Sequence, residues 1–214
     1  MALTSSMTRT SRTTLALLVG ALVFTGLISR EPAGADHLPA NKTAAAGSTT
    51  QVVAPGENVT LLSATIRSSN PTDLILQVTA ECSIVTNVTT IGNDNQRAFG
   101  QVRVWVEIDG SPVPVATADA SGGRVVFCNR AYQRTTELLD DEDATIRTFF
   151  STRHANAFNW LKLDVGSGIH TIEVKGELTA EATDRAVAEA VIGNRSLIVE
   201  PTKLPNDATV DEVA

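Results

Sequence analysis

The sequence is poor in the residue types that build catalytic and metal centres. Its 214 residues include 3 histidines and 2 cysteines, and aromatic side chains make up 4%. The histidines, His37, His154 and His170, are far apart, and no His-x-His, His-Glu-x-x-His or closely paired cysteine spacing occurs. We therefore expect no cofactor and no transition-metal site. Because a Gly-x-Ser-x-Gly motif and a glycine-rich phosphate loop before a helix are also missing, the sequence predicts that the protein is not an enzyme.

Long hydrophobic runs are scarce, and the one present lies near the N-terminus. Arg9 and Arg12 precede residues 13–29, a run of 17 residues without a charge. A basic segment followed by an apolar one is typical of a secretory signal peptide, and the small residues just before Asp36 predict cleavage there. An uncut anchor is the alternative, because the run is just short of the roughly 20 residues that span a bilayer. In both cases residues 1–35 predict a secreted or cell-surface protein with no further membrane insertion.

Positive charge is also in short supply. The formal net charge of the chain is -7, and residues 1–35 contribute +2, which leaves -9 on the rest. An acidic exported chain repels the phosphate groups of nucleic acids and anionic lipid surfaces. The partner that we expect is therefore an unknown protein or glycan at the cell surface, and not a nucleic acid.

The sequence does contain segments in which apolar and polar residues alternate. In residues 74–84, 102–108 and 168–178 most of the apolar side chains stand at every second position, which is the period of a strand with one buried face. Turn residues between such segments, at Asp109-Gly110 and at 166–168, indicate β-hairpins. Segments of this kind predict an all-β fold, a single β-sandwich of about eight to ten antiparallel strands.

The limits of the sandwich follow from where the alternation begins and ends. Residues 36–48 have no apolar period and are expected to form a flexible lead-in, residues 49–206 the β-sandwich domain, and residues 207–214 a disordered tail. One internal segment is ambiguous. Residues 179–192 are rich in alanine and fit either a helix or two strands around Asp184-Arg185, and we favour strands because the flanking segments are strands.

The two cysteines are expected to form a disulfide. Cys82 lies on the apolar parity of its strand, and Cys128 lies in a second apolar segment, so a bond between them would join two core strands. Disulfides persist outside the cytoplasm, which agrees with the predicted signal peptide. A reactive or metal-bound thiol is the alternative, but no third cysteine or neighbouring histidine completes such a site.

The run Gly168-Ile169-His170-Thr171-Ile172-Glu173-Val174 resembles the late strand of immunoglobulin-like sandwich modules found on bacterial surfaces, in which a short glycine turn precedes an alternating strand. Two features depart from the immunoglobulin pattern. Trp105 comes 23 residues after Cys82, and Val126 stands two residues before Cys128, where that pattern has a tyrosine. The topology therefore stays open between immunoglobulin-like and jelly-roll.

Trp105 is the candidate ligand-binding residue. It alternates with Arg103 and Glu107 on the parity expected to face water, and an exposed indole beside charged hydrogen-bonding groups suits the stacking of a sugar ring. Cover by a loop or by a further strand is the alternative. The adjacent Phe149 and Phe150 point to opposite faces of a strand, so one of the two must leave the core unless both faces are covered.

The acidic run at 140–143 is the one candidate for a metal site. Asp140, Asp141 and Asp143 are loop carboxylates of the kind that bind Ca²⁺. The run lacks the Asp-x-Asp-x-Asp-Gly order and the distant bidentate glutamate of the twelve-residue calcium loop. A solvated, self-repelling acidic loop fits it better, so we expect no metal site.

Two functions remain after these exclusions. The first is an exported non-catalytic β-sandwich protein with a structural or interaction role at the cell surface or in the medium. The alternative is a carbohydrate or small-ligand binding module that uses Trp105, with Arg103 and Glu107, as an exposed aromatic on the sheet face.

Overall fold

The computed structural model of the protein describes residues 42–116, 119–137, 144–205 and 208–210. No helix in this part of the chain is long and apolar enough to cross a membrane. The signal peptide predicted at 1–35 and the calcium candidates Asp140, Asp141 and Asp143 lie outside the described residues. The strands, in chain order, are β1 (Thr43–Gly47), β2 (Gln51–Val53), β3 (Asn58–Ser68), β4 (Thr72–Ile91), β5 (Asp94–Ile108), β6 (Ser111–Pro112), β7 (Val125–Thr136), β8 (Thr145–Val165), β9 (Gly168–Ala182) and β10 (Ala186–Thr202).

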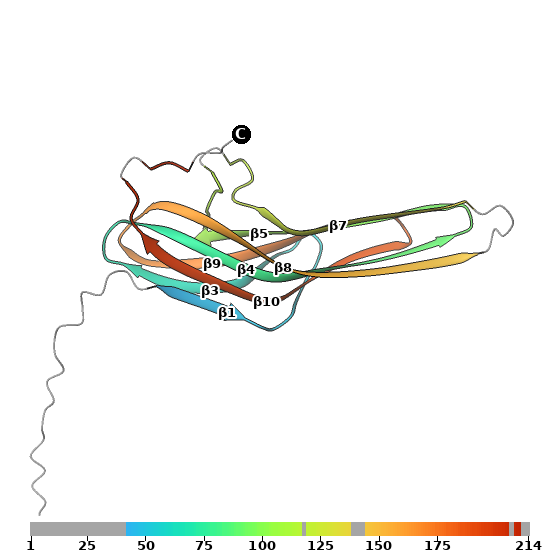
Figure 1. Ribbon diagram of the computed structural model, residues 1–214, viewed down its shortest axis with the longest axis horizontal. Helices are drawn as coiled ribbons and strands as arrows, with labels where there is room; N and C mark the ends of the chain where they lie inside the picture. Colours follow the sequence, from blue (N-terminus) through green and yellow to red (C-terminus); the bar gives the residue numbers. More distant parts are fainter. Residues whose placement is uncertain (1–41, 117–118, 138–143, 206–207, 211–214) are drawn as a thin grey trace, which may run out of the picture. The chain divides into compact units, whose positions relative to one another are not determined.

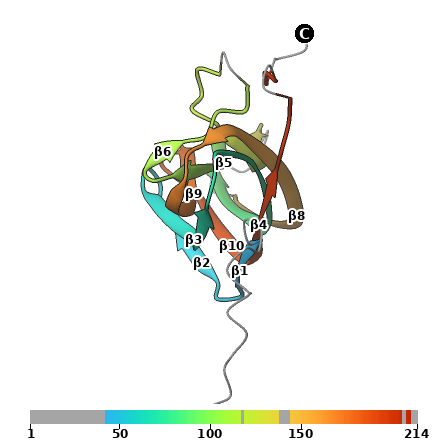
Figure 2. The same cartoon turned by 90° about the vertical axis from the view of Figure 1, so that its left-hand side faces the viewer.

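The strands form two antiparallel sheets that face each other (Figure 1, Figure 2). Sheet A has the order β1-β10-β4-β8, and β2 also pairs with β10. Sheet B has the order β3-β9-β5-β6, and β7 also pairs with β5. The all-β sandwich predicted from the alternation is therefore confirmed at the level of two packed antiparallel sheets.

The core lies between the sheets and consists of the side chains on the apolar parity. Leu74, Leu76 and Val78 of β4 and Val102 and Val104 of β5 are almost fully buried there. Burying a side chain of this size contributes about 1.5–3 kcal/mol relative to leaving it in water. The central strands of the two sheets therefore account for much of the hydrophobic stabilisation.

The predicted disulfide is present between Cys82 and Cys128, whose Cα atoms are 6.2 Å apart. Cys82 belongs to β4 of sheet A and Cys128 to β7 of sheet B, so the bond links the two sheets. Near one end of the sandwich, Trp160 of β8 is also buried, and its Nε1 donates a hydrogen bond of 2.8 Å to the carbonyl of Gly123.

One feature differs from the prediction. Residues Thr43–Gly47, expected within the flexible lead-in, form β1 on the edge of sheet A, where small side chains suffice because one edge stays open. At Gly193-Asn194 β10 contains a β-bulge, since the register with β4 shifts between Ile192 and Arg195. Residues 179–192, the segment that fitted either a helix or two strands, form the end of β9 and the start of β10 on either side of a turn, as predicted.

The far halves of the longest strands form a part of the sandwich that lacks β1, β3 and β6, on the right in Figure 1. We call this part, residues 82–102, 128–136, 145–154 and 178–192, the arm. Its small core contains Val88, Ala98 and Ala186, with Tyr132 packed against them. The sheets approach closely here, because a Cβ on Gly100 would lie 3.0 Å from Ile84 of the opposite sheet.

Candidate interaction surfaces

Trp105 lies on the outer face of sheet B, as its parity predicts, but it is not exposed. Its side chain is 2% exposed, and the guanidinium of Arg124 lies over the ring at 4.4 Å from the centroid. The indole Nε1 donates a hydrogen bond of 2.8 Å to Glu107. An indole covered in this way offers no free ring face for a sugar, so the exposure on which the ligand hypothesis depends is wrong.

The other polar groups around Trp105 are paired with one another. Lys175, opposite Trp105 in the register, lies 3.0 Å from Glu173 and 3.9 Å from Glu107. Arg103, the third predicted site residue, donates to Gln101 and not to Glu107. The outer face of sheet B is thus a ladder of mutually compensated charges. Among the described residues no group of three or more His, Cys, Asp or Glu side chains is arranged to hold a metal ion.

His170 joins two turns at the end of the sandwich opposite the arm. Its Nδ1 lies 2.8 Å from Oδ2 of Asp109, and its Nε2 lies 2.9 Å from the carbonyl oxygen of Gly166. The hydrogen bond with Asp109 raises the pKa of His170 despite its partial burial, and the same bond lowers the pKa of Asp109. His170 is therefore a structural clasp between the β5–β6 and β8–β9 turns.

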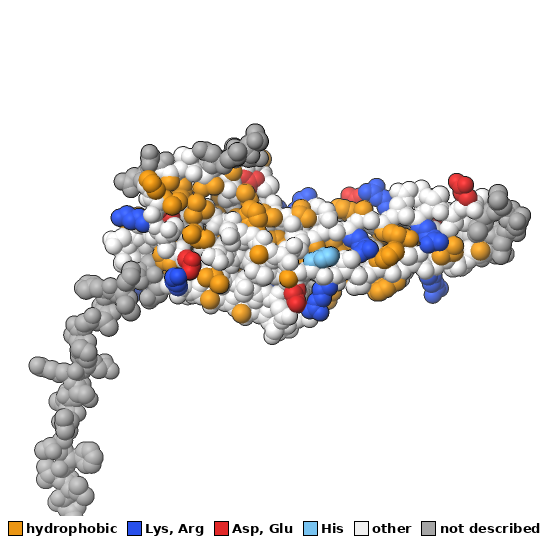
Figure 3. Space-filling model, in the orientation of Figure 1, with side chains coloured by type: hydrophobic (Ala, Val, Ile, Leu, Met, Phe, Trp, Pro, Cys, Tyr) orange, Lys and Arg blue, Asp and Glu red, His pale blue; other side chains and the backbone are white. Residues whose placement is uncertain are grey.

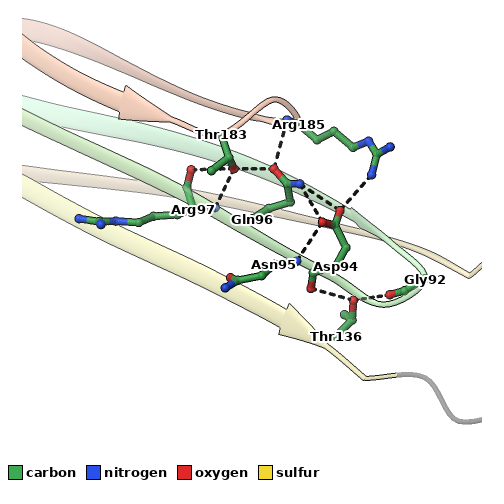
Figure 4. A network of polar contacts seen from close by, with 8 residues as sticks. All are labelled: Gly92, Asp94, Asn95, Gln96, Arg97, Thr136, Thr183 and Arg185. Carbon is green, nitrogen blue, oxygen red and sulfur yellow. Dashed lines mark hydrogen bonds and ion pairs between the residues drawn. The ribbon is translucent and has the colours of Figure 1, made fainter.

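At the tip of the arm, a polar network ties three chain segments together (Figure 4). The amide of Gln96 donates to Asp94 at 2.9 Å, and its oxygen accepts from Thr183 and from the backbone N–H of Arg185. Arg185 in turn donates to Asp94, and the Gln96 hydrogen bond is the main reason that the pKa of Asp94 is lowered. Thr136 of β7 adds a bond to the carbonyl of Gly92. The polar groups of the network bond to one another, so we infer that the network stabilises the tip of the arm.

The outer face of sheet A carries more of the exposed large hydrophobic side chains than that of sheet B, among polar residues such as Asn87, Glu81 and Arg153. The register of β2, β10, β4 and β8 places side chains of one parity on this face. Eight large hydrophobic side chains are exposed in the described part of the chain, and five of them lie here: Val52, Ile91, Phe149, Val187 and Ile198.

Phe149 and Val187 are the most prominent residues of this face on the arm. They flank Asn87 in one cross-strand row and are 65% and 52% exposed. Phe150, the neighbour of Phe149, points the other way and packs against Tyr132, with ring centroids 4.7 Å apart. The expectation that one of the two phenylalanines leaves the core is therefore confirmed.

A shallow hollow of about 260 Å³ lies on the same face, closer to the body of the sandwich. Glu81 and Arg153 form an ion pair beside it, and the bulge residue Asn194 donates to the same carboxylate. The pKa of Glu81 is lowered chiefly by the Arg153 hydrogen bond. A Cβ on Gly193 would lie 2.7 Å from Glu81, so the bulge glycine leaves space for this pair.

Comparison with known proteins identifies no family. No protein-family model and no curated protein matches the chain. Solved structures of infectious bursal disease virus are similar over part of their length. For the Gx strain the identity is 12% and the TM-score 0.31, with 78% of this chain and 33% of that chain covered. For the Gt strain the values are 14%, 0.25, 80% and 38%, so the chain spans about a third of the viral chains, and scores this low carry no conclusion.

Proposed function

We propose that the protein is an exported, non-catalytic β-sandwich that binds another molecule at the cell surface or in the medium through the outer face of sheet A. The observation that carries this proposal is the grouping of exposed hydrophobic side chains on that face, including Val52, Phe149 and Val187. Phe149 and Val187 stand in one cross-strand row on either side of Asn87, and exposed apolar side chains gathered on one face commonly mark an interaction site. The paired charges on sheet B provide the contrast, because a solvated outer face of an antiparallel sheet is normally polar.

The contact is tested by removing apolar side chains from one face at a time. The double variant Phe149→Ser, Val187→Ser removes two exposed side chains from sheet A. The matched control, Val126→Ser, Ile169→Ser, removes two from sheet B, where they are 45% and 72% exposed. The full chain is added to cells of the producing organism, and the cell-bound fraction is measured after sedimentation. We expect the sheet A variant to lower this fraction at least about fivefold and the control to leave it unchanged.

Equal binding by both variants, or no cell-bound fraction for the unmodified chain, would refute the use of this face. Export is tested separately by the mass of the protein recovered from outside the cell. We expect a chain that begins at Asp36, because cleavage follows the small residues of a signal peptide. Recovery from the cytoplasm alone would contradict export. The choice between immunoglobulin-like and jelly-roll topology stays a prediction.

A further inference from the structure

We propose that the outer edge of β8 is a strand-addition site for an extended segment in which acidic and apolar residues alternate. This inference rests on the proposed interaction role and names the class of partner. In strand addition, an extended peptide forms backbone hydrogen bonds with an open sheet edge, and its side chains fall alternately on the two faces of the sheet. β8 borders the outer face of sheet A, so an added strand would extend that face.

The edge of β8 is long, and no described strand pairs along it. In the described part of the chain β8 pairs only with β4, and the register runs without a shift from Thr145 to Lys162. This stretch contains neither proline nor glycine. Proteins commonly protect an edge strand by making it short, bulged or proline-containing, or by placing charged side chains on it. Over 18 residues β8 has only the last of these features, Arg147, Arg153 and Lys162, which oppose pairing with another basic strand and leave its backbone groups able to pair with an acidic one.

The side chains along this edge carry one sign of charge. Residues 125–136 of β7 and 145–163 of β8 include no acidic residue, whereas the whole chain has a net charge of -7. Arg153 is paired with Glu81 of the neighbouring strand. The basic residues of the two stretches are Arg130, Arg134, Arg147, Arg153 and Lys162. In Figure 3, basic side chains lie among hydrophobic ones on this part of the molecule.

The charge pattern argues against a second copy of the chain as the occupant. In any antiparallel register of two copies of residues 145–163, no basic residue meets an acidic one, because the stretch has no acidic residue. Like charges placed opposite each other destabilise strand pairs. A segment that carries carboxylates is favoured by the same rule.

The inner and outer sides of the β8 edge differ in their side chains. We therefore expect the partner segment to place acidic residues on one side and apolar residues on the other. On the inner side, Arg130 lies over the ring of Phe150 at 4.7 Å. Arg134 donates from Nη1 to Thr148, while its buried Nε has no acceptor among the described residues. On the outer side Phe149 offers apolar contact between Arg147 and Arg153, and Arg153 is already paired with Glu81. An added strand would thus meet the two arginines of β7 on its inner side, and Phe149 with Arg147 on its outer side.

The test uses synthetic peptides with the full chain. The probe is a labelled ten-residue peptide of alternating Glu and Val, and its binding is followed by fluorescence anisotropy. One control has the same composition in two blocks, so that it keeps the charge and loses the alternation. A second replaces Glu with Lys. We expect the alternating peptide to bind at least about tenfold more tightly than either control, with slower amide exchange along β8.

Variants place the binding on this edge. Arg130→Glu with Arg134→Glu is expected to weaken binding at least about tenfold, while Arg67→Glu, a basic residue of β3 on sheet B, has little effect. Unchanged melting temperatures ensure that the variants are folded. The proposal is overturned if alternating and block peptides bind equally, or if Arg67→Glu weakens binding as much as the double variant.

Two further results would also overturn it. One is a dimer whose β8 amides are already protected without peptide. The other is no binding of the alternating peptide at all. Peptide binding combined with unchanged cell binding by the Phe149, Val187 variant would instead leave the inference intact and refute the proposed function, so the two failures can be told apart.

Discussion

Single residues set the conditions under which the ends of the sandwich hold together. Both ring nitrogens of His170 face acceptors, the carboxylate of Asp109 and the carbonyl of Gly166. Only the doubly protonated imidazolium can donate to both. This geometry agrees with the raised pKa of His170 and the lowered pKa of Asp109. The clasp is therefore a charged pair under mildly acidic conditions.

The sign of its pH dependence follows from these shifts. The stabilisation by His170 is complete below its unfolded pKa of 6.5 and is lost as the pH rises through the higher folded value. The contribution of Asp109 is present above 3.8 and is lost as the pH falls through its lower folded value. We expect Asp109→Asn to lower the melting temperature most near pH 5, and progressively less toward pH 9. A His170 titration midpoint at or below 6.5 by NMR would contradict the clasp.

Glycine at 123 is required for two separable reasons. Gly123 has φ 76°, and a Cβ there would lie 1.9 Å from the carbonyl oxygen of Val113. Gly110 has nearly the same φ, 78°, but open space around it. Alanine at Gly110 should cost about 1–2 kcal/mol for the left-handed backbone alone. We expect Gly123→Ala to cost at least about 2 kcal/mol more, because the overlap with Val113 adds to the same strain.

Chemical denaturation of the two variants measures this difference, and Gly110→Ala serves as the matched control. The carbonyl of Gly123 also accepts the Trp160 hydrogen bond, so displacement of this loop should change the tryptophan fluorescence in the Gly123 variant. Equal losses of stability in the two variants would show that the loop can move away from the added methyl group.

At the scale of strands, the disulfide is the strongest single constraint between the sheets. It closes a loop with a sequence separation of 46 residues. In the chain-entropy description, a bond closing a loop of this length stabilises the folded state by about 4 kcal/mol. We expect Cys82→Ser with Cys128→Ser to lose about that amount in urea unfolding, and reduction of the unmodified protein to have the same effect. A loss below about 1 kcal/mol would mean that the unfolded chain is already restricted.

Central strands were easier to predict from the sequence than edge strands, because a central strand has a neighbouring strand on each side. The alternation of β4 was readable because its inner face is buried along its length, from Leu74 to Thr90. β8 shows no such alternation in its middle, because residues 153–157 are polar or small. A polar middle is physically reasonable in an edge strand, because the inward-pointing side chains of that strand lie at the open margin of the sandwich. β1 escaped notice for the same reason, since an edge strand can form without large apolar side chains.

Trp105 shows the limit of prediction at a candidate site. Its parity was predicted correctly, but its burial depends on Arg124, which follows a turn 19 residues later in the sequence and returns over the ring. Periodicity describes one strand at a time and contains no information on which long side chain reaches across from elsewhere. The outer face of sheet A had a signal of its own, the adjacent Phe149 and Phe150, which required one ring to be exposed.

At the scale of the whole described molecule, the two outer faces differ in degree. Sheet B presents ion pairs such as Lys175 with Glu173, and sheet A presents most of the exposed large hydrophobic side chains, such as Phe149. This asymmetry was not predictable, because alternation marks which residues leave the core and not which strands share a sheet. It depends on the pairing of β10 with β4 and of β9 with β5.

The covalent link between β4 and β7 also has a mechanical consequence. When the two ends of the chain are pulled apart, tension passes through the sulfur bridge, so residues 83–127 carry no load. The oxidised chain should therefore lengthen by about 150 Å less than the reduced one in single-molecule stretching, given about 3.3–3.6 Å for each extended residue. If the protein is held at a surface by one end and pulled from the other, the segment that contains β5 and half of β4 bears no tension, even under a force that unfolds the rest of the chain.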